Sequence, residues 1–123
     1  MTASKVLIAE DEPHIVESLS FLLTREGYDV SSASDGEAAF ARLWDVRPDL
    51  MILDIMLPRM NGFEVLRRVR ADPDLRGLPV ILLTAKGQAQ DRQRAEEIGA
   101  DAFITKPFSN REVMDRVRAL VAG

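Results

Sequence analysis

Residues 50–54, Leu-Met-Ile-Leu-Asp, constrain the fold more than any other stretch of this chain. Four consecutive apolar residues are typical of an interior strand in a parallel sheet, which is buried on both faces. Because an unpaired carboxylate is costly to bury, we expect Asp54 at the carboxyl end of this strand, at the edge of a cleft. Pro58 and the pair Asn61-Gly62 then supply turn chemistry.

Strand-like segments alternate with helical patterns along the whole chain. The expected strands are residues 5–9, 28–33, 50–54, 79–83 and 102–105, and the expected helices begin near Pro13, Ser34, Asn61, Gln88 and Ser109. Ser34 with Glu37 and Ser109 with Glu112 have the spacing of a capping box, and Asn61 with Glu64 offers another cap. Strand–helix alternation predicts an α/β fold, a parallel sheet with helices on both faces, because right-handed crossovers place helices there.

The expected helix at residues 88–98 differs from the others because it has few apolar residues. These are Ala89, Ala95 and Ile98, so we expect this helix to be the least firmly packed. The arginines of this helix and of the preceding one are interpreted as solvated helix surface: Arg67, Arg68, Arg70, Arg92 and Arg94.

Composition limits the class of protein. A chain of 123 residues predicts one domain over residues 1–123, and its net charge of −4 argues against a direct nucleic-acid binder. The absence of cysteine excludes disulfides and thiolate metal sites. No apolar run approaches the roughly 18 residues of a membrane span, and the N-terminus has no signal-peptide pattern. We therefore expect a cytoplasmic protein that makes no membrane contact.

Polar side chains follow four of the expected strands. Glu10-Asp11-Glu12 follow the first, Asp54 ends the third, Thr84 follows the fourth and Lys106 follows the fifth. In open parallel sheets, ligands bind beyond the carboxyl ends of the strands, so these groups should converge there. Carboxylates suit Mg²⁺, while a lysine and a hydroxyl suit phosphoryl oxygens. An ionised aspartate beside a cation can attack phosphorus.

These residues carry a resemblance to a known family. The matching positions are Glu10-Asp11, Asp54 with Pro58 and Gly62, Thr84-Ala85, and Lys106-Pro107-Phe108. Together they resemble the signature of response-regulator receiver domains, in order and over essentially the whole chain. The resemblance implies a flavodoxin-like, doubly wound fold, with five helices on both faces of a five-stranded parallel sheet in the order 2-1-3-4-5.

The resemblance also implies a role for each site residue. Asp54 would accept a phosphoryl group from a histidine kinase or phosphotransfer protein, and Thr84 and Lys106 would bind the phosphoryl oxygens. The Mg²⁺ cofactor would be held by Asp11, Asp54, the backbone carbonyl of Met56 and, through water, Glu10. Phe103 occupies the position of the switch aromatic, and the Lys106-Pro107 bond resembles one that is usually cis. Phosphorylation would shift the surface formed by the fourth helix, fifth strand and fifth helix.

Three positions depart from the family pattern. Glu10 stands where Asp is more common, and Phe103 lacks the hydroxyl of the frequent Tyr. Ala102 replaces an Asp that normally pairs with a basic residue such as Arg116, which weakens the case for a phosphorylation-linked homodimer. The chain stops at Gly123, so we expect no output domain within it. The downstream partner is then a separate target protein or a missing output domain.

Two alternatives to the phosphorylation switch remain open. A Mg²⁺-dependent aspartyl-phosphate phosphatase would need a second acid two residues after the nucleophile, where this chain has Met56. A pseudo-receiver would act by protein contact alone, without phosphorylation, and the acidic pair with Thr84 and Lys106 argues against it. The expected molecule is therefore a switch and not an enzyme, catalysing only its own phosphoryl transfer and dephosphorylation.

Overall fold

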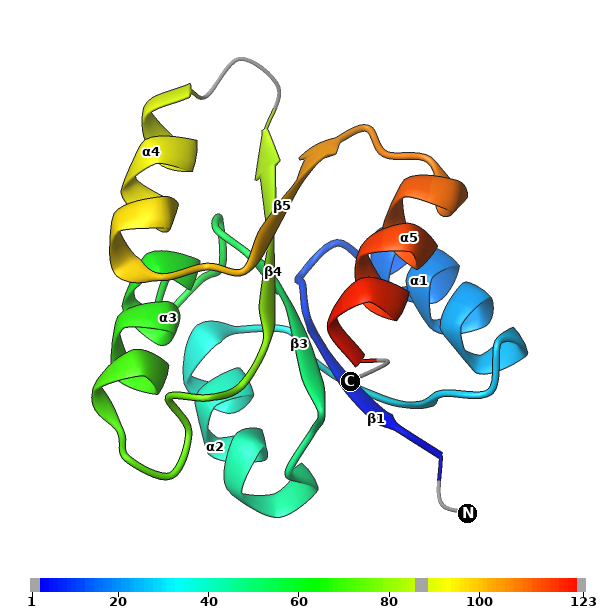
Figure 1. The fold of residues 1–123 in the computed structure, drawn as a ribbon, viewed down its shortest axis with the longest axis horizontal. Helices are drawn as coiled ribbons and strands as arrows, with labels where there is room; N and C mark the ends of the chain where they lie inside the picture. The colour runs from blue at the N-terminus through cyan, green and yellow to red at the C-terminus, as the bar shows by residue number, and fades with distance from the viewer. Residues whose placement is uncertain (1–2, 86–88, 122–123) are drawn as a thin grey trace.

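The computed structural model describes residues 3–85 and 89–121, in which five parallel strands form one sheet with helices on both faces (Figure 1). The strand order is β2-β1-β3-β4-β5, which confirms the expected flavodoxin-like topology. The elements in chain order are β1 (Lys5–Ala9), α1 (Pro13–Arg25), β2 (Asp29–Ala33), α2 (Gly36–Val46), β3 (Leu50–Asp54), α3 (Gly62–Ala71), β4 (Val80–Ala85), α4 (Ala89–Ile98), β5 (Ala102–Lys106) and α5 (Asn110–Val121).

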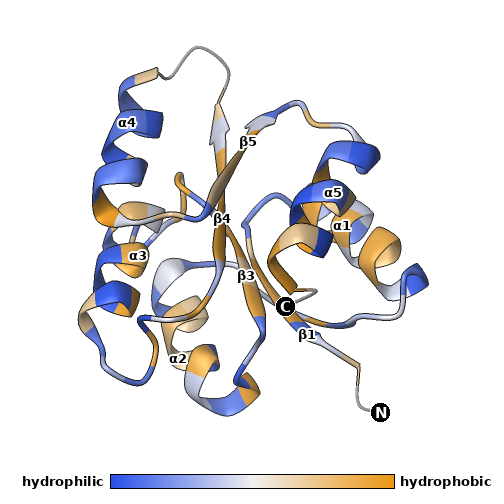
Figure 2. Ribbon diagram, viewed as in Figure 1, coloured by the Kyte–Doolittle hydropathy of each residue, from blue (hydrophilic) through white to orange (hydrophobic). Residues whose placement is uncertain are grey.

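Strand β3 lies at the centre of the sheet, between β1 and β4. All five of its residues are buried, as its apolar run predicts. Alternate strand residues enter two separate hydrophobic cores. Leu7, Met51 and Leu82 pack on the side of α2, α3 and α4, whereas Ile8, Ile52 and Ile81 pack on the side of α1 and α5. Figure 2 shows that the strands are mostly apolar, whereas the helices on both sides mix hydrophilic and hydrophobic residues.

Two of the three expected caps are confirmed and one prediction was wrong. Asn61 Oδ1 accepts the Glu64 amide at 3.0 Å, and Ser109 Oγ accepts the Glu112 amide at 3.1 Å. Helix α2 is capped by Asp35 instead of Ser34, with Oδ1 2.7 Å from the Ala38 amide. The reason is that the backbone is still extended at Asp35 and the helix begins one residue later, at Gly36.

The strand ends differ from the expected ones by one or two residues. Strand β4 extends through Thr84 to Ala85 because these residues pair with Thr105 and Lys106 of β5. This pairing carries Thr84 and Lys106 within the sheet to its carboxyl edge. Helix α4 is described from Ala89, and the expected start at Gln88 lies outside the described residues.

Candidate functional site

Three carboxylates meet at the carboxyl edge of the sheet. Glu10 and Asp11 follow β1, and Asp54 ends β3, its neighbour in the sheet. One carboxylate oxygen from each lies within 4.8 Å of the others. Glu10 and Asp54 are buried, at 1% and 4% exposure, whereas Asp11 is exposed. The structure thus brings together the three acids that the sequence predicted, with Asp54 more deeply buried than expected.

Lys106 explains how these carboxylates can be buried. Its Nζ lies 2.7 Å from Glu10 Oε1 and 3.4 Å from Asp54 Oδ1. Burial by itself would lower the pKa of Lys106, but hydrogen bonding to Glu10 and the charges of Asp54 and Glu10 outweigh it, so this pKa lies above its ordinary value of 10.5. The ammonium therefore stays charged at neutral pH and faces the carboxylate of Asp54. The Lys106-Pro107 bond is cis, as expected.

Thr84 lies at the same edge, near the end of β4, and is 4% exposed. Its Oγ1 is 3.5 Å from Oγ1 of Thr105, the residue beside it on β5. This distance is at the limit for a hydrogen bond and therefore indicates a weak one. The hydroxyl is thus lightly held and free to reorient. Sequence reasoning missed Thr105, although the parallel register of the two strands offered a signal.

The remaining predicted residues surround this centre. Met56 is 74% exposed, on the loop that follows Asp54. Phe103 is half-buried on β5 and packs against the core that lies beneath α4. The guanidinium carbon of Arg92, from α4, is 5.4 Å from the centroid of the Phe103 ring. The expected switch aromatic therefore contacts the helix predicted to be weakly packed.

A cleft with a volume of about 470 Å³ opens beside the acidic cluster. Asp11, Met56 and Asn61 line it on one side, and Asp91 and Arg94 of α4 contribute from the other. The interpretation of Arg94 as plain solvated surface was therefore incomplete. Its guanidinium carbon lies 4.4 Å from the centroid of the Phe63 ring, at the wall of the same cleft.

The family model described as "Response regulator receiver domain" matches residues 6–118. The chain belongs to this family. It is 44% identical over 117 residues to the alkaline phosphatase synthesis transcriptional regulatory protein PhoP of Bacillus subtilis, an alignment that covers 95% of this chain and 48% of that protein. It is 45% identical over 116 residues to the probable transcriptional regulatory protein TcrX of Mycobacterium tuberculosis, covering 94% and 49%.

Solved structures of receiver domains share the fold. A signal receiver domain of a signal transduction histidine kinase from Syntrophus aciditrophicus is 40% identical with a TM-score of 0.92, covering 98% of this chain and 92% of that one. The receiver domain of sensor histidine kinase PA1611 from Pseudomonas aeruginosa is 27% identical with a TM-score of 0.90, covering 99% and 100%. In that protein a magnesium ion is coordinated in the active site cleft.

Receiver domains are signalling modules, and this one is homologous to the response regulators of two-component systems. The chain spans about half the length of the curated relatives it matches. Among the described residues, no helix is both long enough and apolar enough to cross a membrane.

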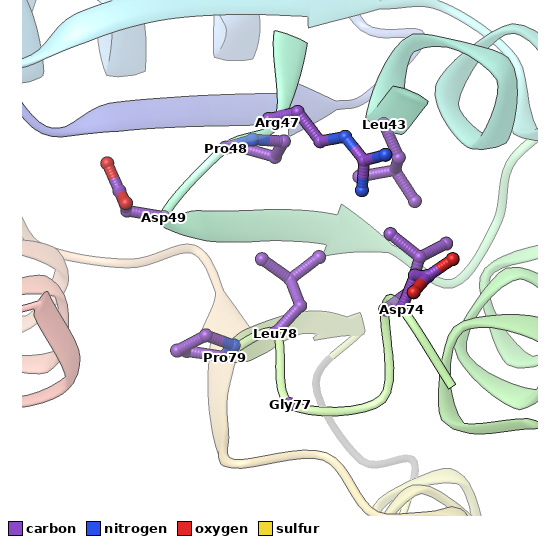
Figure 3. A pocket seen from close by; sticks show the side chains of 9 residues that line it. Leu43, Arg47, Pro48, Asp49, Asp74, Gly77, Leu78 and Pro79 are labelled. Atoms are coloured by element: carbon purple, nitrogen blue, oxygen red, sulfur yellow. The ribbon is translucent and has the colours of Figure 1, made fainter. Parts of the chain in front are cut away.

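The opposite end of the sheet also has a hollow, with a volume of about 310 Å³. Figure 3 shows it between the end of α2 and the loop that precedes β4, where Leu43, Arg47, Asp74 and Leu78 face it. None of the predicted site residues lines this hollow. Asp54, Thr84 and Lys106 lie instead at the carboxyl edge of the sheet, with the acidic cluster.

Proposed function

We propose that this receiver domain is a Mg²⁺-dependent switch in which Asp54 accepts a phosphoryl group from a histidine kinase or phosphotransfer protein. The observation that supports this most strongly is the position of Asp54. Its carboxylate lies within 4.8 Å of those of Glu10 and Asp11 and 3.4 Å from the Lys106 ammonium. A carboxylate kept ionised by cations is a nucleophile at neutral pH.

The residues present fit a Mg²⁺ ion. The three acids offer hard oxygen ligands, and the buried Glu10 carboxylate already contacts a cation, the Lys106 ammonium, through Oε1 at 2.7 Å. Asp11 and Asp54 would hold the ion directly, together with the backbone carbonyl of Met56, and Glu10 would act through water. When bound, Mg²⁺ supplies positive charge that offsets the negative charge of the phosphoryl oxygens.

Transfer forms one bond and breaks one. An oxygen of the Asp54 carboxylate attacks phosphorus, and the P–N bond to the donor histidine breaks. Its electron pair stays on the imidazole nitrogen, which takes up a proton from solvent. Lys106 Nζ and the Thr84 hydroxyl each donate a hydrogen bond to phosphoryl oxygens, and the product is an aspartyl phosphate.

The new phosphoryl group is a stronger acceptor than the hydroxyl that Thr84 now contacts. Because the Thr84–Thr105 contact of 3.5 Å is weak, Thr84 turns toward the phosphate at low cost. Phe103 then turns inward beneath α4. The resulting change in the surface of α4, β5 and α5 is passed to an output domain or to a separate target protein.

In this role the domain is a switch that catalyses only its own phosphorylation and dephosphorylation. The methionine at position 56 supports this, because a phosphatase of the aspartyl-phosphate type would need an acid at that position. The expected cytoplasmic location, the phosphorylation-linked homodimer and the expected extent of one receiver domain without an output domain stay predictions.

Intact mass after incubation with acetyl phosphate, with and without Mg²⁺, tests this function. We expect one labile phosphoryl adduct that requires Mg²⁺ and is absent in Asp54→Asn. Asp49→Asn is the matched control, since Asp49 is exposed and its carboxylate accepts a hydrogen bond from the Lys5 amide at the other end of the sheet. Circular dichroism checks that both variants fold.

Two outcomes would overturn the proposal. A folded wild-type protein that forms no adduct would instead be a pseudo-receiver. Sustained release of phosphate over many turnovers would instead indicate a phosphatase.

A further inference from the structure

Arg94 places a positive charge at the entrance to the acidic cleft. The cleft of about 470 Å³ has Asp11 and Met56 on the side of the site and Arg94 on the side of α4. Within the described residues, Arg94 forms no ion pair. Its charge is therefore not committed to a carboxylate and is available to an incoming anion.

Phe63 fixes where that charge lies. The Arg94 guanidinium carbon is 4.4 Å from the ring centroid of Phe63, which is 4% exposed and lines the same cleft. A guanidinium over an aromatic face is attracted by the electrons of the ring. This contact orders a long side chain in advance, so that less conformational entropy is lost when the guanidinium binds a ligand.

A cation at this entrance offsets the charge of the acids there. A phosphoryl donor is an anion, and Asp11, whose carboxylate lies within 4.8 Å of that of Asp54, lines this cleft together with Asp91. Lys106 is directed toward Glu10 and Asp54 inside the site, at 2.7 and 3.4 Å, and does not line this cleft. Guanidinium is well suited to phosphoryl oxygens, which it binds with two parallel hydrogen bonds.

We propose that Arg94 binds the phosphoryl group of the donor at the entrance of the cleft, before transfer to Asp54. This assigns a donor-binding residue to α4 and rests on the proposed phosphorylation of Asp54. The exposed Met56 side chain and Pro58 offer apolar contact to the leaving group of a small acyl phosphate. Arg94 therefore acts on capture of the donor and not on the bond-breaking step.

Arg92 is a matched control on the same helix. It also lies over a phenylalanine ring, at 5.4 Å from the centroid of Phe103, and it too is exposed. It does not line the cleft. Arg92→Gln and Arg94→Gln thus remove the same charge from the same helix, and only Arg94→Gln removes it from the entrance.

The experiment measures the rate of adduct formation against acetyl phosphate concentration, at saturating Mg²⁺, for wild type and both variants. We expect Arg94→Gln to raise the half-saturating donor concentration about two- to fivefold, as for the loss of one solvent-exposed ionic contact, with the maximal rate unchanged. Arg92→Gln should match wild type. Added salt should reduce the difference between wild type and Arg94→Gln, because the contact is electrostatic.

Each other outcome overturns the assignment of Arg94. An equal increase of the half-saturating acetyl phosphate concentration in both variants would show an effect of net charge alone. A lower maximal rate at unchanged half-saturation would place Arg94 in the chemical step. No change in either variant would show that the donor does not contact Arg94. Failure of the wild type to form any adduct would instead contradict the proposed function itself, so the two failures are distinguishable.

Discussion

Helices α3 and α4 lie beside each other on one face of the sheet, and each spans ten residues (Figure 1). Their packing is very different. Helix α3 buries five residues: Gly62, Phe63, Val65, Leu66 and Val69. Helix α4 buries Ala95 alone among its described residues, and Figure 2 shows most of its ribbon in the hydrophilic colour. Burial of apolar surface is the main source of stability, so α3 is the firmly held helix.

The start of α3 is tied to the phosphoacceptor strand. The Gly62 amide donates to the Ile55 carbonyl at 2.9 Å, and Asn61 caps the helix. A Cβ at Gly62 would collide with the Asp54 carbonyl, so only glycine permits this close approach. Helix α3 therefore holds the loop after Asp54 in place.

Helix α4 is attached mainly at its end. Arg70 of α3 donates hydrogen bonds to the Gly99 carbonyl at 2.8 Å and to the Leu78 carbonyl at 2.7 Å, and it pairs with Asp101 at 2.8 Å. These contacts fix the turn between α4 and β5, while the body of α4 has few apolar anchors. The comparison indicates a division of roles, in which one helix fixes the reacting carboxylate and its neighbour is free to respond.

The largest effect should come from shortening a buried side chain on α3. Leu66 is fully buried, so Leu66→Ala should lower the free energy of unfolding by about 2–5 kcal/mol. Ile98→Ala on α4 should cost about 1 kcal/mol, because Ile98 is half-buried and loses less contact. Urea unfolding followed by circular dichroism measures both.

If both variants lost the same free energy of unfolding, α4 would be packed as firmly as α3, and the proposed difference between the two helices would be wrong. An unchanged slope of the free energy against urea concentration would confirm that each variant unfolds in the same way as the wild type.

A smaller effect is expected from the contact that joins the two helices. Arg70→Met should lower the free energy of unfolding by about 1–3 kcal/mol, because the partly buried carbonyl groups of Gly99 and Leu78 lose a charged donor. Hydrogen exchange should become faster at the end of α4 and in the turn to β5, and should change little in α3. Arg67→Met is the control, since Arg67 is exposed and pairs only with Glu64 among the described residues. Uniformly faster exchange across both helices would show that Arg70 supports the whole face and not the α4 end.

The sequence was sufficient to predict most of the fold and of the site. Apolar runs that end in polar residues located the strands and placed Asp54, Thr84 and Lys106 at one edge, because parallel strands end together. The weak packing of α4 was equally visible, since a helix with few apolar residues cannot bury much surface. These features depend on the order of apolar and polar residues along the chain, and on the small number of ways in which alternating strands and helices can form a parallel sheet.

Contacts made by long side chains across the fold were not predictable in this way. Arg70 was interpreted as solvated surface with Arg67 and Arg68, yet its guanidinium reaches carbonyl groups 8 and 29 residues away in the sequence. Arg94 was treated as surface for the same reason. Where an arginine head lies depends on neighbouring loops, whose conformation no periodic pattern specifies.

The smallest effect concerns charge on the surface of α3. Hydrogen bonds from Arg68 and Arg67, at 3.0 and 2.9 Å, hold the pKa of Glu64 below its ordinary value of 4.5. The pKa of Glu64 is therefore lower in the folded than in the unfolded protein. The ionised carboxylate stabilises the fold at pH values above the unfolded pKa, and this stabilisation is lost as the pH falls through the folded pKa. Glu64→Gln should therefore melt slightly below wild type at pH 7, and the difference should vanish well below pH 4.5.

Melting temperatures of wild type and Glu64→Gln, measured at pH 7 and again well below pH 4.5, test this prediction. Glu97→Gln on α4 controls for the loss of an exposed carboxylate, because Glu97 forms no ion pair among the described residues. A Glu64→Gln difference that persists in acid would mean that the carboxylate stabilises α3 without its charge. If Glu97→Gln lowered the melting temperature at pH 7 as much as Glu64→Gln, the ion pairs of Glu64 with Arg67 and Arg68 would add no more stability than any exposed carboxylate. The difference in stability between α3 and α4 would then come from burial of apolar side chains alone.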